Sequence, residues 1–333
     1  MSHTLRFALI GAGGIAKAYV AVFAAFAQAR VVAVADPYAR RAREVAESLN
    51  CPAFASHGDL LEQVPCDAAV ICTPPATHVQ VALDLVEQGI PVLCEKPLAV
   101  DLASARKLVN AAAIDGVPLT MAAKFRYVDD AILAKSIVDS GDLGKLVLFD
   151  NIFASRVPMG DRWNADPAVS GGGVLIDNGT HSVDIARYFL GSITDVMAVK
   201  RRRVQDVPVE DTAQMLIRSG DGVCGTIDLS WSIDMQADRY ISIYGSEGTI
   251  NVGWRESKFR PAGSADWIKF GDGYDKVKAM RAQLTNFCEA LRGREELLIT
   301  AEDALASVAV IEAAYASMAS SAWVPVDAAA SSA

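Results

Sequence analysis

Over its first 122 residues the chain alternates short apolar runs with longer segments whose apolar positions recur at helical spacing. The apolar runs predict β-strands at residues 5–10, 31–35, 53–55, 67–72, 91–94 and 118–122. Between them, helices are predicted at residues 39–49, 77–88 and 101–113. Strands and helices in alternation build a parallel sheet covered by helices. Residues 1–122 are therefore predicted to form a doubly wound α/β domain.

The pattern changes after residue 122. Residues 226–231 alternate polar and apolar side chains, as a strand with one covered face does. The other predicted elements are a strand at 146–154, a hairpin connection at 244–249 and helices at 127–140, 276–292 and 301–318. Residues 123–333 are predicted to form a second α/β domain with an open mixed, largely antiparallel sheet. The tail from Asp327 onward has nothing to bury and is expected to be frayed.

A glycine turn, Gly11-Ala12-Gly13-Gly14-Ile15-Ala16, joins the first strand to an alanine-rich helix. Gly11 permits a tight turn, and Gly13 lets backbone N–H groups approach a pyrophosphate at the positive end of the helix. This strand, turn and helix, followed by a second strand, are typical of a dinucleotide-binding site, although a plain structural turn is the alternative interpretation.

The second strand ends at Asp36, about where the dinucleotide fingerprint places an acid that binds the ribose hydroxyls. A carboxylate there repels a 2′-phosphate and favours NAD as the cofactor. Arg40 and Arg41 follow closely and keep NADP possible.

Length and composition indicate how many domains the chain forms and which partners and cell compartments are expected. A chain of 333 residues is expected to form two domains. The net charge of −9 argues against nucleic acid and anionic membranes as partners. The six cysteines have neither disulfide-framework nor zinc-site spacing, so a reducing cytoplasm is expected. No apolar window is long enough for a membrane span, and no secretory signal pattern is expected at the N-terminus.

Two short segments follow predicted strands at the edge where open α/β sheets bind ligands. One is Cys72-Thr73-Pro74-Pro75, with His78 after it, and the other is Glu95-Lys96-Pro97. Pro97 biases Lys96 toward an extended conformation, which aims its side chain into the crevice. A solvated surface lysine is the alternative.

A third segment, Gly171 to Asp184, begins with three glycines that open a predicted helix. Asp177, His181 and Asp184 stand at positions i, i+4 and i+7, which places them on one helix face. A histidine beside a carboxylate suits general acid–base catalysis. A helix-capping arrangement and a metal site of these three residues are the alternatives, and no metal is expected because such sites normally take further ligands.

Together, the glycine turn, the Glu95-Lys96-Pro97 turn and the Gly171 to Asp184 segment resemble the glucose-fructose oxidoreductase, inositol dehydrogenase and MocA family over nearly the whole chain. This resemblance implies a Rossmann domain followed by an α/β domain whose open sheet forms homodimers or homotetramers. It also implies hydride transfer between nicotinamide and a carbon bearing a hydroxyl group on a sugar, a cyclitol or a nucleotide sugar.

The resemblance assigns the site residue by residue. It implies catalytic roles for Lys96, Asp177 and His181, and substrate contacts for Lys96, Arg126, Asp177 and His181. With the glycine turn, the expected cofactor contacts are Gly11, Gly13, Gly14, Ile15, Asp36, Thr73, His78, Glu95, Lys96, Arg162 and Trp163. The chain departs from many members at Ala123-Lys124, where they carry an asparagine before the arginine.

The leading hypothesis is reversible oxidation of a secondary alcohol, with His181 as the base and Lys96 as the donor to the developing alkoxide. Two other functions stay open at this point. One is NAD-dependent hydrolysis of a glycoside, in which the redox step is transient. The other is a non-catalytic nicotinamide sensor that regulates a partner protein.

Overall fold

The computed structural model describes residues 3–326, so the tail predicted to be frayed from Asp327 lies outside the described residues. The chain forms two compact units. Of the described residues, the first unit comprises 3–99, 103–124 and 276–304, and the second comprises 100–102, 125–275 and 305–326.

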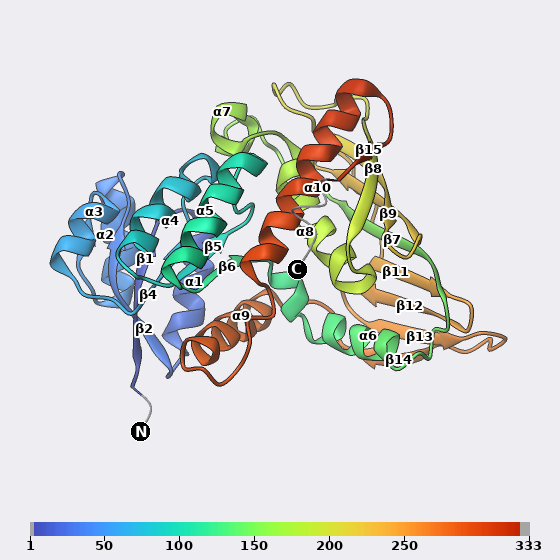
Figure 1. Ribbon diagram of the computed structural model, residues 1–333, viewed down its shortest axis with the longest axis horizontal. Coiled ribbons are helices and arrows are strands. Elements are labelled where there is room, and N and C mark those ends of the chain that lie inside the picture. Colours follow the sequence, from blue (N-terminus) through green and yellow to red (C-terminus); the bar gives the residue numbers. More distant parts are fainter. Residues whose placement is uncertain (1–2, 327–333) are drawn as a thin grey trace. The chain divides into compact units, whose positions relative to one another are not determined.

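The first unit contains a six-stranded parallel sheet in the order β3-β2-β1-β4-β5-β6 (Figure 1). Its strands are β1 (Leu5–Ile10), β2 (Ala29–Ala35), β3 (Ala53–Phe54), β4 (Ala68–Ile71), β5 (Val92–Glu95) and β6 (Leu119–Ala122). Its helices include α1 (Gly14–Ala24), α2 (Ala39–Leu49), α3 (His57–Gln63), α4 (His78–Glu87) and α5 (Leu102–Asp115). The predicted Rossmann fold is confirmed, and the strand order reverses between β1 and β4, where such sheets bind ligands.

Helix α9 (Lys276–Leu291) completes the first unit, although the sequence analysis assigned all residues after 122 to the second domain. Met280, Leu284, Phe287 and Cys288 of α9 are buried in the same core as β1 and α1. The Phe287 ring lies 6.1 Å from that of Phe7 on β1. Burial of this apolar helix face on the first sheet is the physical reason for the difference.

The second unit contains a nine-stranded sheet in the order β14-β13-β12-β11-β7-β10-β9-β8-β15. Its strands are β7 (Leu146–Ala154), β8 (Ile193–Lys200), β9 (Thr212–Ser219), β10 (Cys224–Ser230), β11 (Arg239–Gly245), β12 (Gly248–Gly253), β13 (Ser257–Pro261), β14 (Ile268–Gly271) and β15 (Val324–Pro325). Among these strands, β7 and β10 pair in parallel and the other neighbours are antiparallel. The mixed, largely antiparallel sheet is thus confirmed.

One face of this second sheet is covered by helices α6 (Asp129–Asp139) and α8 (Val174–Leu190) (Figure 1). Two other helices of the chain are α7 (Pro167–Ser170) and α10 (Ala301–Ser320). Phe149 of β7 faces α8, with its ring 6.4 Å from that of Phe189. Side chains alternate along a strand, so Leu148 lies on the opposite face, where it is 50% exposed.

We name the face that bears Leu148 the helix-free face, because no helix of the described residues covers it in Figure 1. Leu216 of β9 shares this face and is 41% exposed. Polar side chains lie between them, and the Thr226 hydroxyl donates to Asp150 Oδ1 at 2.6 Å. The face therefore combines exposed leucines with hydrogen-bonded polar groups.

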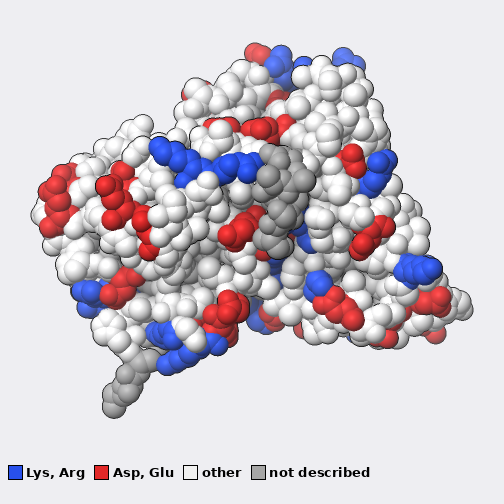
Figure 2. All heavy atoms as spheres, viewed as in Figure 1, with Lys and Arg blue, Asp and Glu red and all other residues white. Residues whose placement is uncertain are grey.

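Charge is interspersed on the face of the protein in Figure 2, where acidic and basic side chains alternate over both units. Within residues 3–326, no helix has the length and apolar character that crossing a bilayer requires.

Replacing Phe287 by alanine is expected to lower the free energy of unfolding by about 3 to 5 kcal/mol, because a large ring would leave a cavity beneath β1. Val277, near the start of the same helix, is 38% exposed, and its replacement by alanine should cost much less. Urea denaturation of the two full-length variants measures the difference. Equal stabilities would contradict the placement of α9 in the first core.

Candidate functional site

The glycine turn packs directly against the end of β4. Gly11 has φ of +95°, and a Cβ atom built on it would lie 2.6 Å from the carbonyl carbon of Cys72. Its N–H donates to the carbonyl of Ala35 at 2.7 Å. Only glycine meets both demands, because an L side chain disfavours this backbone conformation and no room exists for it.

The next two glycines face open space. Apart from its own chain neighbours and helix backbone, a Cβ atom built on Gly13 or Gly14 would have no atom of residues 3–326 within 4 Å. Gly13 is the N-cap residue of α1 and has no side chain to cap the helix, and no acidic residue occupies the first turn. The helix thus presents backbone N–H groups and a positive dipole end to this space, which suits the pyrophosphate of a dinucleotide.

Asp36 connects β2 to the glycine turn. It is 7% exposed, and its two carboxylate oxygens accept hydrogen bonds from the backbone N–H groups of Ala12 and Tyr38, both at 2.8 Å. The Arg41 guanidinium lies 4.5 Å from the centre of the Tyr38 ring. Arg40 forms an ion pair with Glu44, so both nearby arginines have partners on α2 and its N-cap.

His78 is buried beneath the two segments that follow β4 and β5. Its Nδ1 lies 2.8 Å from the carbonyl of Pro97, and its Nε2 lies 2.8 Å from the carbonyl of Thr73. Burial lowers the pKa of its imidazole. The residue is 0% exposed, and its expected contact with the cofactor stays a prediction.

Glu95 is the last residue of β5, and Lys96 follows it at a cis peptide bond to Pro97. Both side chains are partly buried. Burial raises the pKa of the Glu95 carboxyl, while the positive charges of Lys124 and Lys96 oppose the rise. Lys96 therefore lies beside a partly buried acid at the carboxyl edge of the sheet.

The first unit brings most of the predicted cofactor residues to one edge of its sheet. These residues follow the carboxyl ends of β1, β2, β4 and β5, and they are Gly11, Gly13, Gly14, Ile15, Asp36, Thr73, Glu95 and Lys96. Parallel strands have their carboxyl ends at the same edge, which is why residues so far apart in sequence lie together.

The glycine triplet before α8 serves close packing. A Cβ atom on Gly172 would collide with the hydroxyl of Tyr315, and one on Gly173 would collide with the carbonyl of Glu210. The Glu210 carboxylate accepts hydrogen bonds from the N–H groups of Gly173 and Leu175, at 3.0 and 3.1 Å. The N-terminus of α8 is therefore capped by an acid of the chain itself.

The predicted common face of α8 is divided. Asp177 is partly exposed, and His181, one turn later, is 6% exposed. Asp184 is 0% exposed and forms a bidentate ion pair with Arg126, with Nε and Nη2 of the arginine 3.0 and 2.8 Å from the two carboxylate oxygens. The sequence analysis missed this pair, since no short motif connects residues 58 positions apart.

The expected contact of Arg126 with the substrate stays a prediction, and the structure places its guanidinium in this buried pair. Arg126 is 5% exposed, and its guanidinium also lies 5.5 Å from the centre of the Tyr188 ring. Separating the two partners would leave an uncompensated charge in the interior, which is strongly unfavourable. The pair therefore holds the loop before α6 against α8. The pair uses the carboxylate of Asp184, the third member of the metal site that the sequence left as an alternative. Within residues 3–326 no three or more His, Cys, Asp or Glu side chains are grouped so that they could hold a metal ion.

Aromatic rings surround one side of His181. The Phe125 ring meets the imidazole edge-on at 5.1 Å between centroids and stacks on Tyr274 at 5.1 Å. Trp254, which is 37% exposed, extends this group. These residues come from three distant segments, and no local motif in the sequence predicts that they meet.

Arg162 and Trp163 lie on an exposed stretch at the start of the short helix Trp163–Ala165. Trp163 is 45% exposed. Their expected contact with the cofactor stays a prediction.

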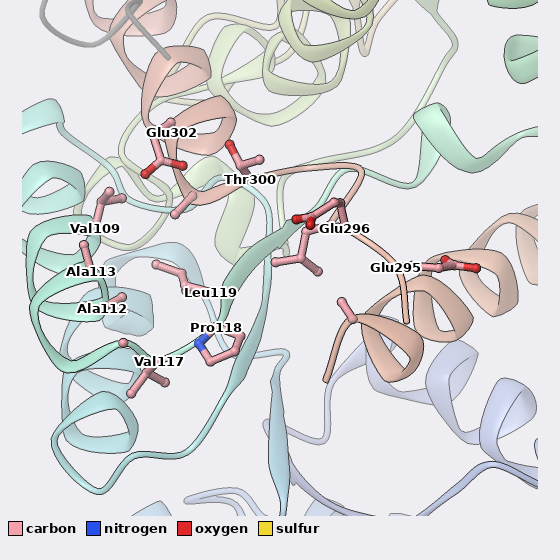
Figure 3. A pocket seen from close by; sticks show the side chains of 14 residues that line it. Val109, Ala112, Ala113, Val117, Pro118, Leu119, Glu295, Glu296, Thr300 and Glu302 are labelled. Carbon is pink, nitrogen blue, oxygen red and sulfur yellow. The ribbon is translucent and has the colours of Figure 1, made fainter. Parts of the chain in front are cut away.

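A pocket of about 370 Å³ lies at the other edge of the first sheet (Figure 3). Pro118 and Leu119, at the amino end of β6, line it together with the end of α5 and the segment before α10. Glu295, Glu296 and Glu302 contribute carboxylates. Because the glycine turn and Lys96 follow carboxyl ends of strands, this pocket is separate from the candidate cofactor site.

Family models match most of the chain. The NAD-binding Rossmann fold of an oxidoreductase family matches residues 5–123. The GFO/IDH/MocA C-terminal domain matches residues 132–251, and the C-terminal alpha/beta domain of the oxidoreductase family matches residues 269–326.

Individual proteins are similar along their full length. The chain is 29% identical over 317 residues to the rhizopine catabolism protein MocA of Rhizobium meliloti, covering 93% of each chain. It is 27% identical over 333 residues to the inositol 2-dehydrogenase of Rhizobium meliloti (strain 1021), covering 95% of this chain and 97% of the relative. A solved structure of levoglucosan dehydrogenase in complex with NADH matches this chain with a TM-score of 0.91 at 20% identity. The match covers 97% of this chain and 99% of that one.

Replacing Gly13 by alanine is expected to leave stability nearly unchanged and to weaken NAD binding by about tenfold or more, the equivalent of about 1.4 kcal/mol. The new methyl group meets no protein atom but enters the space offered to the pyrophosphate. Thermal unfolding and titration calorimetry measure the two effects.

The matched variant is Gly11→Ala, whose methyl group would collide with the backbone at Cys72 and which should lose stability as well, by about 1 to 3 kcal/mol. Wild-type NAD affinity in Gly13→Ala would contradict the assignment of this space to the cofactor.

Proposed function

Because the chain belongs to the glucose-fructose oxidoreductase, inositol dehydrogenase and MocA family of NAD-binding oxidoreductases, we propose that it oxidises a secondary alcohol of a sugar, cyclitol or nucleotide sugar to a ketone, reversibly. The observation that carries the proposal is the open, uncapped N-terminus of α1 on the same sheet edge as Lys96. Curated relatives named inositol 2-dehydrogenase and scyllo-inositol 2-dehydrogenase (NAD(+)) support the substrate class.

The cofactor residues are those of the first sheet edge. Gly13, Gly14 and Ile15 offer backbone N–H groups to the pyrophosphate, and Asp36 offers its carboxylate to the ribose hydroxyls. Thr73, Glu95 and Lys96 complete the contacts of the first unit, and Arg162 and Trp163 add contacts from the second. NAD is preferred over NADP, because the Asp36 carboxylate repels a 2′-phosphate and Arg40 is paired with Glu44.

A bound nicotinamide would supply the hydride chemistry at the carbon that bears the hydroxyl group. His181 takes the hydroxyl proton as general base. The Lys96 ammonium donates to the oxygen as its negative charge develops, and Asp177 binds a hydroxyl group of the substrate. Arg126 supports this face of α8 through its pair with Asp184.

The helix-free face provides the contact of a homodimer or homotetramer. A second copy of the same face can cover the exposed leucines in a twofold-symmetric contact, which removes their apolar surface from water. The cytoplasmic location expected from the cysteine pattern stays a prediction.

Activity is tested with a panel of sugars, inositols and nucleotide sugars, offered with NAD and with NADP, while the absorbance of reduced nicotinamide is followed. Reduction of NAD by at least one polyol is expected. Cleavage of a glycoside without accumulation of NADH would favour the hydrolase instead, and NAD binding without turnover of any substrate would favour the sensor.

Replacing Lys96 by methionine is expected to lower kcat by about 10² to 10³, because one donor to a developing oxyanion contributes about 3 to 4 kcal/mol. NAD should still bind through the pyrophosphate and ribose contacts, although more weakly, because one cofactor contact and a positive charge beside Glu95 are lost. Steady-state kinetics with the best polyol and NAD titration separate the two. Lys107→Met, on the exposed side of α5, is the matched control, and equal kcat values in the two variants would remove Lys96 from the mechanism.

Replacing Leu148 and Leu216 together by lysine is expected to dissociate the oligomer at micromolar concentration, because two ammonium groups would be buried without partners. Sedimentation velocity measures the mass of the assembly. Ile114→Lys, at a position on α5 that is 83% exposed, is the control and should leave the mass unchanged. An unchanged mass in the double variant would place the contact elsewhere.

A further inference from the structure

Tyr19 and Gln283 lie behind the turn formed by Glu95 and Lys96, within the first unit. Tyr19, on α1, is 0% exposed, and its hydroxyl oxygen lies 3.1 Å from Oε1 of Glu95. Gln283, on α9, is 2% exposed, and its Nε2 lies 3.2 Å from the same hydroxyl oxygen. A hydrogen-bonded chain therefore runs from α9 through α1 to the end of β5.

Which group donates and which accepts in these two hydrogen bonds follows from the protons that each group carries. Burial, and then the charge of Glu95, raise the pKa of the Tyr19 phenol well above its ordinary value, so the phenol keeps its proton. The Gln283 amide donates to the phenol oxygen, and the single O–H of Tyr19 donates to Glu95. A donor aimed at a carboxyl group favours its ionised form.

Opposing influences act on Glu95. Burial raises the pKa of its carboxyl, while Lys124, Lys96 and then the Tyr19 hydroxyl lower it. The thiols of Cys72 and Cys94 also lie near, but burial raises their pKa well above the ordinary value, so they carry no charge at neutral pH. Tyr19 thus supplies a directed hydrogen bond that helps to keep this partly buried carboxyl group ionised.

Helix α9 fixes the far end of the chain of hydrogen bonds. Gln283 stands 264 positions after Tyr19, and its neighbours Met280 and Leu284 are buried in the core of the first unit. Rigid packing of α9 on α1 holds the amide where the phenol oxygen can accept from it.

We propose that Tyr19 and Gln283 are positioning residues, which hold the Glu95 carboxylate ionised and oriented beside Lys96 and thereby set the affinity for the cofactor. The inference rests on the proposed function, in which Glu95 contacts the cofactor. Glu95 loses its charge as the pH falls, so NAD affinity falls on the acid side. Loss of the Tyr19 donor moves this change to higher pH.

The first test needs no cofactor. Glutamate labelled with ¹³C at the carboxyl carbon is introduced into the full-length protein, and the Glu95 signal, identified by its absence in Glu95→Gln, is titrated by NMR. Tyr19→Phe and Gln283→Met are expected to move the Glu95 titration to higher pH. Met280→Leu, one turn earlier on α9, is the control and should leave it unchanged.

The second test measures the dissociation constant of NAD against pH by calorimetry. Tyr19→Phe should weaken NAD binding by about two- to tenfold, as expected for the loss of one hydrogen bond. The effect is expected in the pH range where Glu95 is ionised in the wild type but protonated in the variant. In the Glu95→Gln background the same change should have no further effect, because the two residues act through one contact.

The outcomes separate the two proposals. An unchanged Glu95 titration in Tyr19→Phe would overturn the inference, whatever the protein binds or turns over. A shifted titration with unchanged NAD affinity would contradict the cofactor role of Glu95 in the proposed function, and so would independent, additive effects of Tyr19→Phe and Glu95→Gln. An equal loss of NAD affinity at every pH in Tyr19→Phe would indicate that Tyr19 acts only as a packed core residue. That result would also overturn the inference.

Discussion

The close backbone contact between Gly11 and the end of β4 is the constraint on which the first unit depends. It sets the direction in which the chain leaves β1 and therefore the axis of α1. The axis of α1 in turn decides where its uncapped N-terminus opens and where Tyr19 meets Glu95. A single residue without a side chain thus positions both an anion site and a buried hydrogen bond.

The chain uses glycines at two helix starts for opposite purposes. At α1 they leave open space before the first N–H groups, and the first turn contains no acidic residue. At α8 they allow Glu210 and Tyr315 to approach so closely that the helix end is occupied from within. Binding capacity at a helix N-terminus is therefore decided by what the rest of the fold brings to it, since the same dipole is present in both.

The sequence predicted the elements of the first sheet, the family and the residues at the sheet edge, because periodicity and short motifs are local signals. It did not predict that α9 packs on β1, that Arg126 pairs with Asp184, or that His78 is buried between two carbonyl groups. Each of these depends on contacts between segments far apart along the chain. The roles of Asp177 and His181 stay predictions, because position on α8 alone does not establish chemistry.

Helix α9 makes the core of the first unit discontinuous along the chain. The Phe7 ring packs on Phe23, which follows soon in the sequence, and on Phe287, which follows 280 residues later. The contact with Phe287 therefore cannot form until those residues have been synthesised. During translation the amino-terminal sheet therefore keeps an apolar surface uncovered while strands β7 to β14 of the second sheet are synthesised. Completion of the first core is consequently tied to the synthesis of α9, and a ribosome stalled before α9 would carry an aggregation-prone intermediate.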